Sequence, residues 1–164
     1  VLYVCNVDED SAATGNAFSE KVFAKAENEH AKAVIISAAI ESEVAQLDSE
    51  EEKKEFLSAL GLEETGLAKI IKAGYELLGL ETYFTAGPKE VHAWTFLKGS
   101  KAPQCAGIIH SDFERGFIRA ETISYDDFIK YHGEQGCKEA GKIRSEGKDY
   151  IVKDGDLLNF LFNV

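Results

Sequence analysis

Val1-Leu2-Tyr3-Val4-Cys5 is an apolar run that is followed directly by Asn6-Val7-Asp8-Glu9. A second apolar run, Ala33-Val34-Ile35-Ile36, is followed by Ser37-Ala38-Ala39. Short unbroken apolar runs are typical of buried strands in a parallel sheet. Because a helical pattern separates the two runs, the first half of the chain is predicted to have an α/β fold.

Capping residues and apolar spacing predict three helices in this half. The first covers about residues 18–30 and begins after Asn16 or Thr14. The second begins at the capping box formed by Ser49 and Glu52 and ends near residues 60–61. The third covers about residues 67–78 and stops at Gly79, a common helix end.

From residue 82 onward the apolar pattern changes to that of short strands. Strands are predicted over 82–86, 91–97 and 117–123, and short helices over 103–109 and 125–131. Gly87-Pro88 predicts a turn, and Asp154-Gly155-Asp156 predicts a hairpin between the stretches 150–152 and 157–162. Short strands with few helices indicate a small α+β domain of β-grasp type, which joins the first part near residues 80–83.

The composition is that of a folded protein in water, since 45% of the 164 residues are hydrophobic and 29% are charged. No apolar run could span a bilayer and no signal peptide opens the chain, so we expect a cytoplasmic protein with no membrane partner. The chain contains no methionine and begins in a predicted central strand. We therefore expect it to be the carboxyl-terminal part of a longer protein.

The net charge of −11 is concentrated in the first half. Residues 1–82 contain 7 Lys and Arg against 17 Asp and Glu, a net of −10, and residues 83–164 contain 11 against 12, a net of −1. The first half should repel polyanions, so only the second half is a candidate for contact with RNA, and no specific DNA binding is expected. The basic residues that could form an RNA-facing surface are Lys98, Lys101, Arg115, Arg119, Lys130, Lys138, Lys142, Arg144 and Lys148, with Phe117, Tyr125 and Tyr131 among them. The alternative is scattered solubilising charge among equally many acids.

The three cysteines, Cys5, Cys105 and Cys137, are far apart and odd in number, which favours reduced thiols. Cys105 with His110, and His132 with Cys137, are spaced too loosely for a zinc signature, so no metal site is expected. His110-Ser111-Asp112 contains the residue types of a catalytic triad, but adjacent residues seldom point at one another. Ser111 with Glu114 is a better candidate for a local helix cap, and no catalytic residue is predicted.

Asn6 and Glu9 are candidates for holding a nucleotide base, because ligands of α/β folds bind beyond the carboxyl ends of the strands. In the Asn-Lys-x-Asp motif of P-loop GTPases, the Asp accepts two hydrogen bonds from guanine. Here Glu9 stands at the Asp position and Val7 at the Lys position, which predicts weaker guanine preference and tolerance of adenine. Ser37 and Ala38, after the next strand, resemble the Ser-Ala-x loop that approaches the base edge in the same enzymes. The alternative is a polar loop in which Asn6 bonds local backbone.

Residues 136–143 match the G-x-x-x-x-G-K pattern of a phosphate loop, but Ile143 occupies the position of the Ser or Thr that holds Mg²⁺. No strand precedes this segment. A surface helix or loop rich in Lys and Glu explains it better, and it is rejected as a phosphate loop.

Longer stretches carry a resemblance to a family. They are Asn6 to Glu9, Gly66 to Thr95 with Gly74-Tyr75-Glu76-Leu77-Leu78-Gly79-Leu80, His110 to Ala120, Gly147 to Asp156, and Asn159 to Val164. Together they resemble the YchF family of Obg-like ATPases over the whole chain. Asn6-Val7-Asp8-Glu9 is similar to the family's Asn-x-x-Glu motif, which is associated with ATP in place of GTP.

The resemblance implies a P-loop ATPase domain with a helical insertion, followed by a terminal TGS domain. It also implies that the full-length protein hydrolyses ATP with Mg²⁺ and binds the ribosome, either its large subunit or the 70S-type particle. It assigns residues 1–80 to the end of the nucleotide-binding domain and residues 83–164 to the TGS domain. It places Asn6, Val7, Glu9, Ser37 and Ala38 at the adenine. Since triphosphate affinity depends on a phosphate loop, the fragment alone is expected to hold no cofactor tightly and to be inactive. The alternative is a binding module that contacts the ribosome or a protein through its TGS surface.

Overall fold

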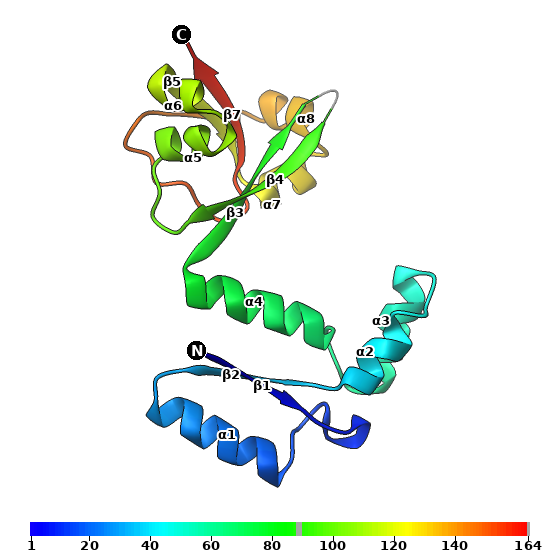
Figure 1. Cartoon of the computed structure of the whole chain (residues 1–164). Coiled ribbons are helices and arrows are strands. Elements are labelled where there is room, and N and C mark those ends of the chain that lie inside the picture. The colour runs from blue at the N-terminus through cyan, green and yellow to red at the C-terminus, as the bar shows by residue number, and fades with distance from the viewer. Residues whose placement is uncertain (88–89, 164) are drawn as a thin grey trace. The chain divides into compact units, whose positions relative to one another are not determined.

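The computed structural model describes residues 1–87 and 90–163 (Figure 1). The chain divides into two compact units, Val1–Leu78 and Gly79–Val164. Pro88 of the predicted Gly87-Pro88 turn lies outside the described residues, although the Gly87 amide donates to the Glu90 carbonyl at 2.9 Å. Among the described residues, no helix is both long and apolar enough to cross a membrane.

The first unit is built on two parallel strands, β1 (Leu2–Asn6) and β2 (Lys32–Ile36), with Asn6 opposite Ile36. α1 (Ala17–Asn28) connects them, and α1 and α4 (Gly66–Leu78) lie on opposite faces of the strand pair (Figure 1). Asn16 caps α1 in a reciprocal capping box with Ser19. This arrangement confirms the predicted strands, the first helix and its cap.

The prediction that β1 is fully buried is wrong, because Val4 is 44% exposed. Among the described residues β1 pairs only with β2, so one of its edges has no neighbouring strand. The apolar core of the unit lies elsewhere, between α2 (Ala38–Val44) and α3 (Glu50–Ala59). It contains Ala12, Ile40, Val44 and Leu57.

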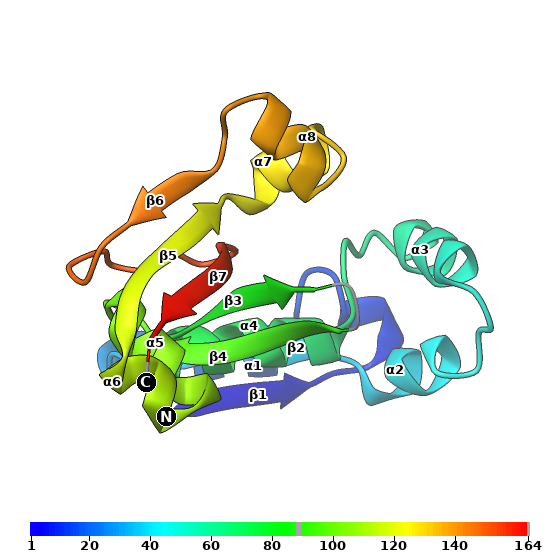
Figure 2. The same cartoon turned by 90° about the horizontal axis from the view of Figure 1, so that it is seen from above.

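The second unit is a five-stranded mixed sheet in the order β4-β3-β7-β5-β6 (Figure 2). The strands are β3 (Leu80–Ala86), β4 (Val91–Leu97), β5 (Phe117–Ile123), β6 (Arg144–Glu146) and β7 (Leu157–Phe162). β3 and β7 are parallel, and the other pairings are antiparallel. The first and last strands of the unit are therefore neighbours at the centre of the sheet.

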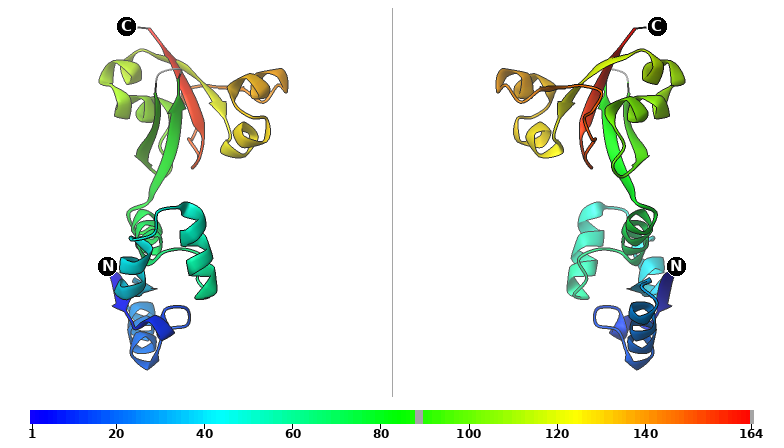
Figure 3. Two further views of the ribbon diagram at one scale, coloured as in Figure 1. Left: turned by 90° about the vertical axis from the view of Figure 1, so that its right-hand side faces the viewer. Right: turned by 90° about the vertical axis from the view of Figure 1, so that its left-hand side faces the viewer.

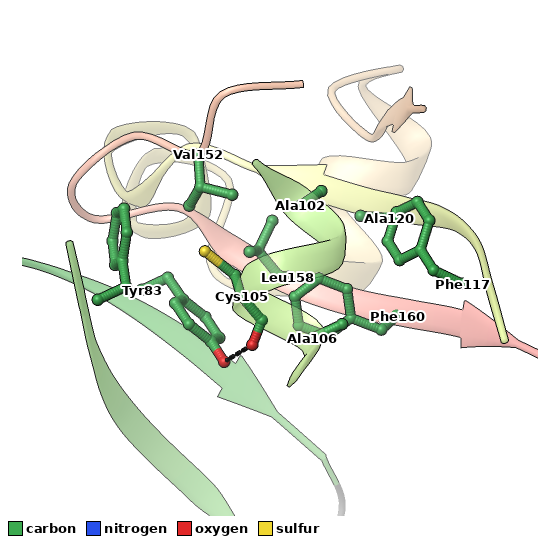
Figure 4. Packing of buried hydrophobic residues seen from close by; sticks show 10 residues of the cluster. Tyr83, Ala102, Cys105, Ala106, Phe117, Ala120, Val152, Leu158 and Phe160 are labelled. Carbon is green, nitrogen blue, oxygen red and sulfur yellow. Dashed lines mark hydrogen bonds between the residues drawn. The ribbon is translucent and has the colours of Figure 1, made fainter. Parts of the chain in front are cut away.

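Helices cover both sides of this sheet (Figure 3). α5 (Ala102–Ile109) and α6 (Ser111–Arg115) lie on one side, and α7 (Tyr125–Lys130) and α8 (Glu134–Glu139) on the other. The main core lies under α5, where Tyr83 is fully buried and its hydroxyl donates to the Cys105 carbonyl at 2.8 Å (Figure 4). Burial raises the pKa of the Cys105 thiol to about 12.

The predicted hairpin at Asp154-Gly155-Asp156 is wrong. β7 pairs with β5 along one edge and with β3 at Leu157 on the other, and residues 150–152 do not join it. That stretch instead pairs with the segment before α5, through bonds from the Ala102 amide to the Tyr150 carbonyl and from the Val152 amide to the Ser100 carbonyl. The turn residues bind β3: the Asp154 carboxylate accepts from the Thr82 amide at 2.8 Å.

Candidate functional site

The two loops that follow β1 and β2 are joined by the side chain of Asn6. Its Oδ1 accepts a hydrogen bond from the Ala38 amide at 2.9 Å, and the Val7 amide donates to the Ile36 carbonyl at 2.9 Å. The alternative to base binding was a bond from Asn6 to local backbone, whereas the observed bond reaches Ala38, 32 positions away in the chain. It uses only the oxygen, and among the described residues the Asn6 Nδ2 donor has no partner. Asn6 therefore fixes both loops and keeps a donor at the carboxyl edge of the strands.

Ser37 lies at the centre of this edge. It is 3% exposed, and its hydroxyl Oγ is buried without a hydrogen-bond partner among the described groups. The expectation of a loop at Ser37-Ala38-Ala39 holds only for Ser37, because Ala38 begins α2. The helix forms here because Ser37 has extended backbone and its carbonyl accepts from the Glu41 amide at 3.0 Å.

Glu9 stands at the rim of the same edge, in a single 3₁₀ turn, η1 (Glu9–Ser11). Asp8 caps this turn by accepting from the Ser11 amide at 2.9 Å. The Glu9 side chain is exposed and makes no hydrogen bond or ion pair with any residue that the structure describes. Asp8 thus has a local structural role, and Glu9 offers two unused acceptor oxygens.

Val7 lines an open hollow of about 420 Å³ between β1 and α1. Asn6, Asn16 and Phe18 also line it, and Phe18 is 78% exposed. Val7 is half-buried and supplies part of the apolar wall beside Asn6, whereas Glu9, Ser37 and Ala38 do not line this hollow. A planar heterocycle with polar edges is the kind of group that such a surface suits.

Glu41 and Gly66 hold this edge in place and were not singled out from the sequence. Both Glu41 carboxylate oxygens accept from the start of α4: Oε1 from the Gly66 amide at 2.6 Å and Oε2 from the Leu67 amide at 3.1 Å. A Cβ on Gly66 would lie 2.8 Å from the Cβ and Cγ2 of Ile36. Glu41 and Gly66 are 25 positions apart in the chain, which left no local pattern from which the contact could be predicted.

The metal and triad look-alikes have structural roles. Cys105 and Cys137 are fully buried, and burial raises the pKa of both thiols, which opposes the thiolate that a metal needs. His110, not Ser111, caps α6, since its Nδ1 accepts from the Asp112 amide at 3.2 Å. No group of three or more metal-ligating side chains is found in the described part of the chain.

Most of the basic residues of the second unit are paired with acids. Six of the nine candidates form ion pairs: Lys98, Lys101, Arg115, Arg119, Lys142 and Arg144. Phe117 is 4% exposed and is part of the core, so it cannot stack on a base. These observations favour scattered, locally compensated charge over a basic RNA-facing surface.

Comparison with protein families finds a match for the second unit. The family model YchF-GTPase_C, described as "Protein of unknown function (DUF933)", matches residues 80–163. That range is about half of the chain.

Curated relatives extend the similarity over the whole chain. The chain is 58% identical over 166 residues to the ribosome-binding ATPase YchF of Bacillus subtilis (strain 168), covering 100% of this chain and 45% of that protein. It is 59% identical over 163 residues to the ribosome-binding ATPase YchF of Escherichia coli O157:H7, covering 99% and 44%. The chain thus spans less than half the length of these relatives.

Two solved structures are also similar to this chain over nearly its whole length. The YchF GTPase of Schizosaccharomyces pombe superposes with a TM-score of 0.82 at 35% identity, covering 98% of this chain and 43% of that one. A GTP-binding protein from Pyrococcus horikoshii OT3 superposes with a TM-score of 0.65 at 18% identity, over 99% and 45% of the two chains. The second likeness is one of fold alone.

Proposed function

The chain belongs to the YchF family, and from this premise we propose that it is the carboxyl-terminal part of a ribosome-associated ATPase of the cytoplasm. Residues 1–80 are proposed to complete the nucleotide-binding domain, and residues 83–164 to form a TGS domain. The parallel pair β1–β2 supports the first assignment. The central parallel pair β3–β7 of a mixed sheet, with α5 packed on one face, supports a β-grasp architecture for the second.

The bond from the Ala38 amide to Asn6 Oδ1 is the observation that carries the nucleotide proposal. It brings together both loops that carry Asn6, Val7, Glu9, Ser37 and Ala38, the proposed base-binding residues. Adenine presents a donor beside an acceptor, so it gains one hydrogen bond from a carboxylate and not the two that guanine gains. A longer Glu9 and an apolar Val7, in place of Asp and Lys, therefore favour ATP over GTP.

ATP hydrolysis requires groups that the described residues do not supply. Mg²⁺ neutralises the phosphates in P-loop enzymes, and a glycine-rich loop with its Lys holds them. We place both in the part of the longer protein outside these 164 residues. The chain itself contributes base contacts and is not catalytic.

Nucleotide competition on the full-length protein tests this proposal. The unmodified protein should hydrolyse ATP and be inhibited more strongly by ADP than by GDP. The double variant Val7→Lys with Glu9→Asp should shift the ATP-to-GTP ratio of kcat/KM toward GTP by about tenfold or more, the effect of one good bidentate hydrogen bond. A strong GTP preference of the unmodified protein would contradict the assignment.

A second proposed activity is ribosome contact through the second unit. Residues 83–164 carry a net charge of −1, against −10 for residues 1–82, so a polyanionic particle repels this half less. Co-sedimentation of the whole chain with ribosomes over a salt series measures the contact. Absence of the chain from the ribosomal pellet at every salt concentration would overturn it.

A further inference from the structure

The β3–β4 hairpin and β7 diverge after a single paired position. Phe84 and Leu157 are partners between β3 and β7, and among the described residues the pairing goes no further along either strand. β3 then continues to Ala86 and β7 to Phe162, and Figure 1 shows the two arms separating. Both strands keep their outer neighbours, β4 and β5. The two facing edges beyond this point are therefore open to a further strand.

A hollow of about 520 Å³ with aromatic walls lies between these two arms, and we call this place the fork. On one wall the rings of His92 and Trp94 lie 4.1 Å apart, and on the other the rings of Phe113 and Phe162 stack at 3.9 Å. Ile109 also lines it. The Trp94 Nε1 donates to Thr85 Oγ1 at 2.9 Å, so the indole is fixed in its position. The volume is that of pockets that take a whole aromatic group.

The charge of the hollow selects among possible ligands. Glu90 is the only Asp, Glu, Lys or Arg among the lining residues that the structure describes, and its side chain is 75% exposed beside His92. Lys and Arg are absent from the described lining, and six of the nine candidate basic residues of this unit are already paired with acids. A nucleic-acid strand needs cations along its phosphates, whereas a basic peptide needs a carboxylate.

We propose that this fork binds an extended, basic peptide segment of a partner protein, with one large apolar or aromatic side chain in the hollow. The peptide backbone would add to the open edges of β3 and β7, its anchor would pack between Trp94 and Phe113, and its flanking Lys or Arg would face Glu90. The proposal rests on ribosome association as the proposed function. It specifies that the chain contacts protein there rather than RNA.

Trp94 is the only tryptophan of the chain, so its fluorescence reports on the hollow directly. The probe is the peptide acetyl-Lys-Arg-Thr-Val-Phe-Val-Thr-Arg-Lys-amide, titrated into the whole chain. It should change the Trp94 emission saturably. The same peptide with Ala for Phe should bind at least about tenfold more weakly, since the buried anchor supplies most of the energy of such contacts.

A matched pair of variants tests whether the negative charge of Glu90 contributes to binding of the basic peptide. Glu90→Lys should weaken binding of the basic peptide about threefold to tenfold. Glu139→Lys, an equal charge change on the exposed face of α8, should leave it unchanged. Circular dichroism confirms that both variants are folded. Equal binding of the Phe and Ala peptides, or tighter binding of octauridine than of the basic peptide, overturns the proposal.

Ribosome co-sedimentation of the chain and of Glu90→Lys separates the two proposals. If the peptide fails to bind while the chain still enters the ribosomal pellet, the fork proposal is wrong and ribosome association stands. If the peptide binds and the chain does not sediment, peptide binding stands and the ribosome is not the partner.

Discussion

At the scale of single residues, Gly66 determines how closely α4 can approach the end of β2. A Cβ at this position would meet Ile36 at 2.8 Å, directly before the buried Ser37. Gly66→Ala is therefore expected to lower the free energy of unfolding by about 1–3 kcal/mol, the usual effect of overpacking. Thermal denaturation followed by circular dichroism measures the change.

Gly74 in the same helix is the matched control. A Cβ there has nothing within 4 Å, and Gly74→Ala should raise helix stability by about 0.5–1 kcal/mol. Equal melting temperatures for the two variants would show that α4 does not press on Ile36.

The three cysteines differ in accessibility, which gives a second prediction at this scale. Cys105 and Cys137 are buried with raised thiol pKa values, and Cys5 is half-buried in the wall of the open hollow beside α1. Ellman's reagent should react with one thiol of the native chain and with all three after unfolding. Cys5→Ser should abolish the native reaction. Rapid reaction of two or more native thiols would contradict the burial.

At the scale of elements, the strands and helices with strong local signals were predictable. The Ser49 and Glu52 capping box, the change of period near residue 80 and the strand over Phe117–Ile123 all agree with the structure. Two of the failures have a tertiary cause. Ala38–Val44 becomes a helix because its apolar Ile40 and Val44 pack in one core with Leu57 of α3. Residues 150–152 pair with the segment before α5, which is far away in the chain and therefore leaves no local pattern.

The residues of the candidate site were predictable from the sequence, but the contacts between them were not. Strand ends identified Asn6 and Ser37, whereas no sequence pattern showed that Asn6 reaches the Ala38 amide or that Glu41 holds Gly66. Both contacts join segments that are distant in the chain. The parallel register of β1 and β2 brings Asn6 to the Ala38 amide, and the approach of α4 to the end of β2 brings Gly66 to Glu41.

The turn before β7 carries a prediction on pH. The Tyr150 hydroxyl donates to the buried Asp156 carboxylate at 2.6 Å. Burial and this hydrogen bond raise the tyrosine's pKa above its ordinary value near 10. The folded state therefore keeps the proton that the unfolded state loses, so this contribution to stability is complete below about pH 10 and declines as the pH rises further.

Urea unfolding at pH 8 and above pH 10 measures that decline. Tyr150→Phe should lose about 1–3 kcal/mol at pH 8, because it removes the bond to Asp156 and the bond that the hydroxyl accepts from Arg144. Its stability should then fall less steeply than that of the unmodified chain at high pH. Parallel declines would mean that other groups, such as the buried Tyr83 whose pKa is also raised, account for the alkaline loss.

At the scale of the whole molecule, the affinity for nucleotides depends on the balance between base contacts and the negative charge of the chain. Residues 1–82 carry a net charge of −10 and surround the proposed base site. A triphosphate meets that field without the phosphate loop that would compensate for it. We therefore expect the chain to bind neutral adenosine at least as well as ATP, with a Kd above about 1 mM in both cases. Amide resonances of Asn6 and Ala38 in ¹⁵N-labelled protein report on both ligands. If ATP bound more tightly than adenosine, the chain would contain a phosphate site of its own, and the assignment of triphosphate binding to the rest of the protein would be wrong.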